Sequence, residues 1–286
     1  MKTTRRNFIK TTGTAIGAAA LMTQMPFGLA SCAAPKPKEF GFQVWTIKDE
    51  LIANFPGILK KMAGLGYKQV EMCSPLGYTS SGFGPLNEMS GTEMKKIIDD
   101  SGLTCISSHY GMGELCESLD NRIEWATQLG MKQMICSSFW LPEGASADEY
   151  RKAADELNGI GEKTKTAGIQ MGFHNHHMEF EKRGDELIYD VLMDELDPEL
   201  VKMQFQVAVV NIGYKAADYF RKYPGRFISA HLADWSAKND KQVAIGQGDV
   251  DWPDFFEAAK IGGVENYLVE MDPGTFGPSA EYLLKI

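Results

Sequence analysis

The sequence predicts an α/β protein whose body is a single (β/α)8 barrel, preceded by an export signal and a short tether. Three observations support this fold class. From residue 40 onward, short apolar runs alternate with segments of 3.6-residue periodicity. Eight such units fit into the roughly 255 residues that follow the signal, which is the usual size of this barrel. Most apolar runs also follow a glycine that can end the preceding helix in a left-handed turn.

The predicted strands are short and evenly spaced along the chain. They cover residues 41–47, 69–73, 104–109, 133–137, 169–174, 201–207, 227–232 and 267–271. The glycines that end the intervening helices are Gly66, Gly102, Gly130, Gly168, Gly225 and Gly263. One long helix is expected at 147–167, and Asp251 followed by Trp-Pro reads as an N-cap with proline in the first turn. A doubly wound sheet is the alternative, but no glycine-rich phosphate turn follows the first strand.

Composition excludes several classes of protein. The 286 residues contain 29 Lys and Arg against 38 Asp and Glu, 44% hydrophobic residues and a formal charge of −9. These values are typical of a globular protein rather than a disordered or fibrous one. The acidic balance argues against a nucleic-acid partner, because phosphate contacts require clustered Lys and Arg.

The first part of the chain, residues 1–31, reads as a twin-arginine/lipoprotein export signal. Basic residues that include a pair of arginines, followed by Asn-Phe-Ile-Lys, precede an apolar stretch. Residues 29–32 (Leu-Ala-Ser-Cys) resemble a lipoprotein box, which predicts lipidation of Cys32, a tether over 32–39 and the barrel over 40–286. The expected location is exported, either periplasmic or anchored to the membrane only through that lipid. The alternative is ordinary cleavage nearby, which would release a free protein.

The candidate site residues are those that end each apolar run, because barrel active sites form at the carboxyl ends of the strands. Four of the five histidines fall at such positions. The polar and aromatic candidates are Trp45, Glu71, His109, His174, His176, Gln206, His231, Asp234, Glu270 and Asp272.

Three of these strand ends can deliver metal ligands to one point. His174 and His176 share one face of their strand, which suits a metal ion or a metal ligand beside an acid/base. Glu270 follows an apolar run, where a carboxylate is costly to bury without a cation or partner. With His231, these strands supply imidazoles and a carboxylate, and the strand at 201–207 should add a fourth group. The plainer alternatives are solvated histidines, a salt bridge at Glu270, and Asp234 capping a turn.

Several segments, taken in order, resemble one family. They are similar to the xylose isomerase-like, sugar phosphate isomerase/epimerase superfamily of TIM barrels. The segments are residues 172–180 (Gly-Phe-His-Asn-His-His-Met-Glu-Phe), 223–234, 246–252 leading into 269–272, and 42–46. The resemblance implies a divalent-metal-dependent enzyme acting on a small sugar or keto-sugar. It implies metal ligands at His174, Gln206, His231 and Glu270. The expected ion is Mn²⁺, with Mg²⁺, Zn²⁺ and Co²⁺ as alternatives.

Departures from the family pattern affect the expected chemistry. Gln206 stands where many members have an acidic ligand, and His174 stands where ketose epimerases have Glu. A site with Glu270 as its one anionic ligand keeps a net charge of +1 with a divalent ion, which favours an anionic enolate. Ala233 replaces a common Lys, which weakens the case for a phosphorylated substrate.

The expected function is a sugar or keto-sugar isomerase or epimerase that works through a metal-stabilised enolate. His176 is the first candidate base, with Glu179, Glu71 and His109 as alternatives or hydrogen-bonding partners. The expected substrate-binding residues are Trp45, Asp234 and Asp272, although Trp45 could equally be core. Alternatives are a keto-glycoside lyase or hydrolase using the same site, and a non-catalytic sugar-binding lipoprotein. A related DNA-repair endonuclease is disfavoured, because removing the signal and its four basic residues lowers the charge from −9 to −13.

Overall fold

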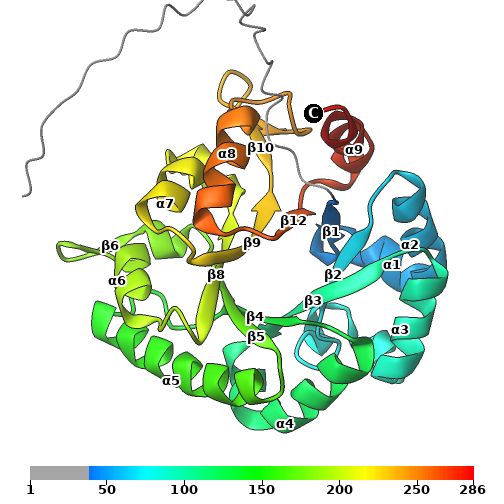
Figure 1. The fold of residues 1–286 in the computed structure, drawn as a ribbon, viewed down its shortest axis with the longest axis horizontal. Helices are drawn as coiled ribbons and strands as arrows, with labels where there is room; N and C mark the ends of the chain where they lie inside the picture. Colours follow the sequence, from blue (N-terminus) through cyan, green and yellow to red (C-terminus); the bar gives the residue numbers. More distant parts are fainter. Residues whose placement is uncertain (1–38) are drawn as a thin grey trace, which may run out of the picture. The chain divides into compact units, whose positions relative to one another are not determined.

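The structure is a computed structural model that describes residues 39–286, and these form a closed barrel of parallel strands (Figure 1). The strand order around the barrel is β1-β12-β9-β8-β5-β4-β3-β2. The bounds are Gly41–Gln43 (β1), Gln69–Cys73 (β2), Thr104–Gly111 (β3), Gln133–Ser138 (β4), Gln170–His174 (β5), Val201–Gln206 (β8), Phe227–Leu232 (β9) and Asn266–Val269 (β12). The predicted barrel is confirmed. The predicted signal, tether residues to 38 and Cys32 lie outside the described residues.

The first strand is shorter than predicted. It ends at Gln43, whose side-chain Oε1 accepts a hydrogen bond from the Trp45 amide. That bond turns the chain into a 3-10 helix, Trp45–Ile47, so Trp45 leaves the sheet and lies at the carboxyl end of the barrel.

Helices lie around the outside of the strands (Figure 1). They are Lys48–Ala53 (α1), Phe55–Gly64 (α2), Gly91–Asp100 (α3), Met112–Leu129 (α4), Ala147–Thr166 (α5), Ile188–Glu195 (α6), Ala216–Lys222 (α7), Trp252–Gly262 (α8) and Phe276–Lys285 (α9). The six predicted helix-ending glycines all have positive φ. Asp251 caps α8 by accepting a bond from the Asp254 amide, as predicted. Among residues 39–286, no helix combines the length and apolar character needed to cross a membrane.

Short elements that the sequence analysis did not predict decorate the barrel. They comprise the 3-10 helices Thr79–Ser81, Gly84–Leu86, Met178–Phe180, Val207–Ile212 (η5) and Pro273–Thr275, and the strands Lys182–Arg183 (β6), Glu186–Leu187 (β7), Asp234–Ser236 (β10) and Lys241–Val243 (β11). β6 pairs with β7 and β10 pairs with β11, each in an antiparallel hairpin. Strands of two or three residues carry too little hydrophobic periodicity to be recognised from sequence.

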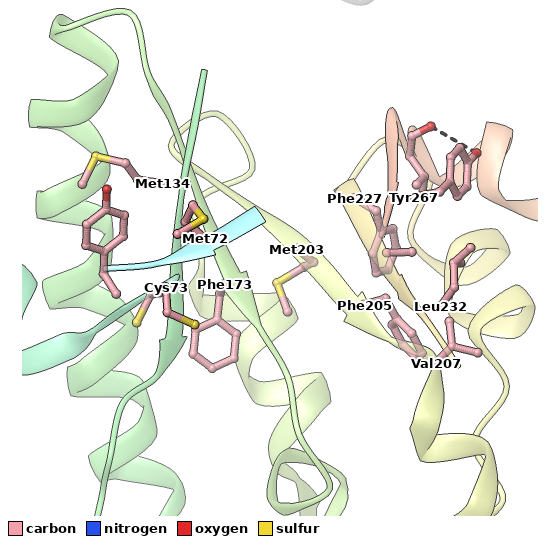
Figure 2. Packing of buried hydrophobic residues seen from close by; sticks show 14 of the residues in the cluster. Met72, Cys73, Met134, Phe173, Met203, Phe205, Val207, Phe227, Leu232 and Tyr267 are labelled. Atoms are coloured by element: carbon pink, nitrogen blue, oxygen red, sulfur yellow. Dashed lines mark hydrogen bonds between the residues drawn. The ribbon is translucent and has the colours of Figure 1, made fainter. Parts of the chain in front are cut away.

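The barrel strands separate an apolar outer layer from a polar interior. Apolar side chains such as Met72, Phe173 and Phe205 are fully buried against the helices, and Figure 2 shows part of this packing. The intervening residues, which project to the opposite face of the sheet, include polar groups that are also buried. Buried polar groups are costly unless they are paired, so an interior of this kind indicates a functional site.

Candidate active site

A cavity of about 310 Å³ opens at the carboxyl ends of the strands. Among the predicted site residues, it is lined by Trp45, His109, His174, His176, Gln206 and Glu270. The other lining residues are Gln43, Thr46, Cys73, Tyr78, Ser137, Trp140, Ala208 and Gln242. A larger cavity of about 580 Å³ includes residues that precede the strands, such as Lys132 and Gly168, and contains none of the predicted site residues. The first cavity is therefore the candidate site.

Three buried imidazoles cluster at this cavity, where His109 and His174 line it and the fully buried His231 does not. Potential ligand atoms of His109, His174 and His231 all lie within 4.8 Å of one another. The ring centroids of His174 and His231 are 4.5 Å apart, and His109 lies 4.9 Å from His174. The strand ends thus bring together the two predicted imidazole ligands and add a third, His109, which was predicted as a proton-transfer or hydrogen-bonding group.

His231 lies between two carboxylates. Its Nδ1 is 2.9 Å from Glu270 Oε2, and its Nε2 is 2.6 Å from Glu71 Oε1. Burial alone would lower the pKa of His231, but the two carboxylates raise that pKa to about 9. Burial opposes ionisation of Glu71, yet the neighbouring His109 and His231 hold its pKa well below the usual range. The pKa of Glu270 is likewise lowered by His231 despite its burial.

Glu71 lies beneath the cavity rather than on its wall. Besides His231, its carboxylate accepts hydrogen bonds from Ser107 Oγ (2.6 Å) and Gln204 Nε2 (2.8 Å), and it lies 3.0 Å from His109 Nε2. Gln204 Oε1 is in turn 2.8 Å from His109 Nε2. A carboxylate on the far nitrogen of a ligating histidine fixes which nitrogen faces the ion, so Glu71 is placed to orient His231.

Gln204 and Ser107 belong to this network, and neither was predicted as a site residue. Gln204 stands two residues before Gln206 on the same strand. The two-residue alternation that places Gln206 inside the barrel therefore also places Gln204 there.

His174 has the features of an open ligand. Its Nδ1 is buried and has no hydrogen-bond partner within residues 39–286. Burial, together with the neighbouring histidines, lowers the pKa of His174 well below the ordinary value, so the imidazole is neutral at pH 7. A neutral imidazole with an unpaired buried nitrogen is suited to bind a cation.

Gln206 takes a different orientation from that expected of an oxygen ligand. Its Oε1 accepts a hydrogen bond from the Ala208 amide (3.1 Å), and its Nε2 donates to Glu270 Oε2 (2.7 Å). The Gln206 side chain therefore caps the start of η5, and its amide oxygen is held by the backbone there. Gln206 thus presents a donor that orients Glu270, whereas the sequence analysis expected it to present oxygen to the ion.

The donor set fits a divalent cation, whose binding would displace the proton that His231, with its raised pKa, carries at neutral pH. His174, His231 and Glu270 converge from β5, β9 and the end of β12, with His109 beside them. Mixed nitrogen and oxygen donors suit Mn²⁺, Co²⁺ or Zn²⁺ better than they suit Mg²⁺ or Ca²⁺, which prefer all-oxygen sites.

His176 lies on the cavity wall next to this cluster. Its ring centroid is 4.8 Å from that of His174, and its buried Nδ1 has no partner among the described residues. Burial lowers the pKa of His176 to about 4, so its imidazole is neutral at pH 7. Glu179 does not line the cavity. Its Oε2 instead accepts a hydrogen bond from the His176 backbone amide (2.7 Å), which holds the loop that follows β5. Burial raises the pKa of Glu179 to about 7.

Aromatic side chains form one wall. Trp45 is half-buried and stacks on Phe83, with ring centroids 6.3 Å apart. It also meets Tyr78 edge to face, with ring centroids 5.8 Å apart. The Lys48 ammonium lies 4.8 Å from the Trp45 ring centroid. Tyr78 is anchored by a hydrogen bond to Ser137 across the cavity wall. Trp45 therefore lies where an apolar sugar face could pack.

The two predicted substrate-binding aspartates lie outside the cavity lining. The buried carboxylate of Asp234 accepts hydrogen bonds from five donors, which are Trp235 N, Gly246 N, Gly248 N, Val250 N and Trp252 Nε1. A Cβ on Gly248 would lie 2.2 Å from Asp234 Oδ1, so this turn requires glycine. Asp272 is exposed, and its backbone amide donates to Gln242 Oε1. The geometry gives Asp234 the role of holding the loop after β11.

Replacing Asp234 by Ala is expected to lower the free energy of unfolding by about 3–5 kcal/mol, because five donors, among them the buried Trp252 indole, lose their acceptor. Asp272→Ala, at an exposed position, should change it by less than about 0.5 kcal/mol. Denaturant unfolding of both variants checks this. An Asp234→Ala variant as stable as the wild type, but unable to bind sugar, would instead restore the substrate-binding role.

Proteins of related sequence include inosose dehydratases from two bacteria. The chain is 28% identical over 159 residues to an inosose dehydratase from Clostridium perfringens (strain 13 / Type A), covering 48% of this chain and 52% of the relative. It is 25% identical over the same length to an inosose dehydratase from Lacticaseibacillus casei. The chain thus spans about half the length of the curated relatives it matches.

Solved structures share the fold across nearly the whole barrel. A sugar phosphate isomerase/epimerase from Parabacteroides distasonis ATCC 8503 superposes with a TM-score of 0.72 and 25% identity, covering 88% of this chain and 94% of that one. A D-psicose 3-epimerase superposes with a TM-score of 0.59 at 14% identity, covering 86% and 97%, which shows a common fold alone. The family model described as xylose isomerase-like TIM barrel matches residues 59–282. The chain therefore belongs to the xylose isomerase-like TIM barrel family.

Proposed function

We propose that this protein is a divalent-metal-dependent enzyme that removes a proton next to the carbonyl of a sugar or keto-sugar and completes an isomerisation or epimerisation through an enolate. The observation that carries the proposal is the convergence of three buried imidazoles with Glu270, of which His109, His174 and Glu270 line the cavity at the barrel mouth. Membership of the family and likeness to a sugar phosphate isomerase/epimerase support it.

The residues divide into those that hold the cation and those that orient them. His174, His231 and Glu270, with His109 adjacent, would bind a divalent cation, whose charge polarises a substrate carbonyl and acidifies the neighbouring C–H. Glu71 holds His231 through Nε2, which leaves Nδ1 facing Glu270. Gln206 donates to Glu270 and fixes the direction of its carboxylate.

His176 is the base that receives the proton. It lines the cavity, it is neutral at pH 7, and its Nδ1 has no competing partner within residues 39–286. The low pKa makes it a weaker base than an ordinary histidine, so the C–H must be strongly acidified before transfer. The pKa of Glu179 is closer to 7, but Glu179 is placed behind the loop and does not reach the cavity. Geometry therefore takes precedence over pKa in this assignment.

Elimination is the second candidate outcome, and the relatives called inosose dehydratases favour it. The same proton abstraction gives an enolate, and loss of a group on the next carbon then releases water, or an alcohol if the substrate is a keto-glycoside. Elimination and isomerisation differ only after the first step.

The test is solvent exchange. The full-length protein, stripped of metal and reloaded with Mn²⁺, is incubated in D₂O with D-fructose, an inosose or a keto-glucoside, and the proton next to the carbonyl is followed by NMR. Exchange is expected with Mn²⁺ and should stop with a chelator. New ketose or aldose signals indicate isomerisation or epimerisation, whereas an unsaturated ketone indicates elimination. Absence of exchange with every substrate in the metal-loaded protein would overturn the proposed function.

A further inference from the structure

Trp140 departs from the way this fold treats its other large apolar residues. Its side chain is 65% exposed, more than any other large hydrophobic residue within 39–286. Its backbone φ is 54°, and in the described part of the chain only Asp240 shares a positive φ without being glycine. Exposure of an indole and left-handed backbone at a bulky residue both oppose folding. Such costs concentrate at functional sites.

The local structure holds Trp140 on the rim of the candidate site. After β4 ends, Phe139 is buried against Phe173, with ring centroids 4.5 Å apart. The Trp140 amide then donates to Ser138 Oγ (3.1 Å), which supports the turn. The indole Nε1 lies 3.1 Å from the position that a Cβ on Gly111 would occupy, so the indole rests against the backbone at the end of β3. Trp140 thereby forms part of the cavity lining.

The size of the cavity indicates what the indole contacts. A volume of about 310 Å³ equals that of roughly ten waters at ~30 Å³ each. A hexose has twelve non-hydrogen atoms, so the cavity has room for one sugar ring but not for two. The exposed face of Trp140 then remains available to whatever projects from that ring toward solvent.

We propose that Trp140 is a subsite for a second ring, and that the ligand is a glycoside with a cyclic aglycone attached to the sugar ring in the cavity. Indole stacks readily on aryl rings and on the apolar face of sugars. The identity of the first ring as a keto-sugar rests on the proposed function. The subsite itself rests on the position, exposure and backbone conformation of Trp140.

The test compares two non-reacting ligands, methyl β-D-glucopyranoside and phenyl β-D-glucopyranoside, by calorimetry with the full-length protein loaded with Mn²⁺. The phenyl glucoside is expected to bind about tenfold more tightly. Trp140→Gly should remove that advantage, and Trp140→Phe should keep most of it. Leu284→Ala, an exposed apolar position on α9 outside the cavity, is the matched control and should behave like the wild type.

Thermal unfolding separates this role from simple packing. Because glycine tolerates positive φ, Trp140→Gly should keep or raise the Tm. A Tm several degrees lower would show that the indole is a packing residue and would overturn the proposal, as would equal affinities for the two glucosides in the wild type or failure of the phenyl glucoside to bind. Absence of solvent exchange with keto-sugars overturns the proposed function but leaves a Trp140-dependent phenyl preference standing, so the two failures are distinguishable.

Discussion

Glu270→Gln is expected to lose its bound divalent metal and its solvent-exchange activity while the barrel stays folded. Among residues 39–286, Glu270 is the one carboxylate that lines the cavity, and its Oε2 lies 2.9 Å from His231 Nδ1. Glutamine keeps the shape of the side chain and its contact with Gln206 but removes the charge. His174→Ala, which deletes a neutral imidazole with an unpaired Nδ1, should have the same effect.

The expected magnitude is at least a hundredfold weaker metal binding, because loss of an outer-shell partner alone typically costs 10- to 100-fold. Metal content after dialysis and the exchange rate measure the loss, and circular dichroism checks the fold. Glu88→Gln, at an exposed position away from the cavity, is the matched control. Full metal content in both Glu270→Gln and His174→Ala would show that the ion binds elsewhere.

The barrel was predictable because its signals are local. The apolar runs at 69–73 and 227–232 coincide with β2 and β9. The glycines that end the helices have the positive φ that their place before a strand predicts, as at Gly130 and Gly263. The first strand was the most overextended, because the hydrogen bond from the Trp45 amide to the Gln43 side chain is a turn signal that apolar periodicity does not contain. The predicted strand at 267–271 also ran two residues past the end of β12.

The site was predictable only in part, because residue type at a strand end indicates where a side chain is but not what it contacts. Strand ends and alternation placed His174, His176 and Glu270 on one cavity. The same reasoning could not show that Asp234 is already saturated by donors from the segment 235–252. It also could not show that a backbone amide holds the Gln206 oxygen, since both features depend on tertiary contacts.

His176→Ala separates catalysis from metal binding. The variant is expected to keep its metal, because the ligand cluster does not include His176, and to lose about 10²–10⁴-fold in exchange rate, the usual contribution of a positioned base. The neighbouring His177 is exposed and does not line the cavity, so His177→Ala is a control that changes the same residue type one position away.

Chemical rescue distinguishes proton transfer from a structural role of His176. Because His176 lines the cavity, the alanine variant leaves room for an added imidazole, which should restore part of the exchange rate. In the wild type, the pKa of His176 near 4 means that the neutral, proton-accepting form is present above about pH 4 and is lost as the pH falls through that value. In the rescued variant, the exchange rate should instead follow the neutral fraction of the added imidazole. That fraction declines as the pH falls below the pKa of free imidazole, which is higher than that of His176. A His176→Ala variant that exchanges at the wild-type rate would remove His176 as the base and direct attention to His109, which also lines the cavity.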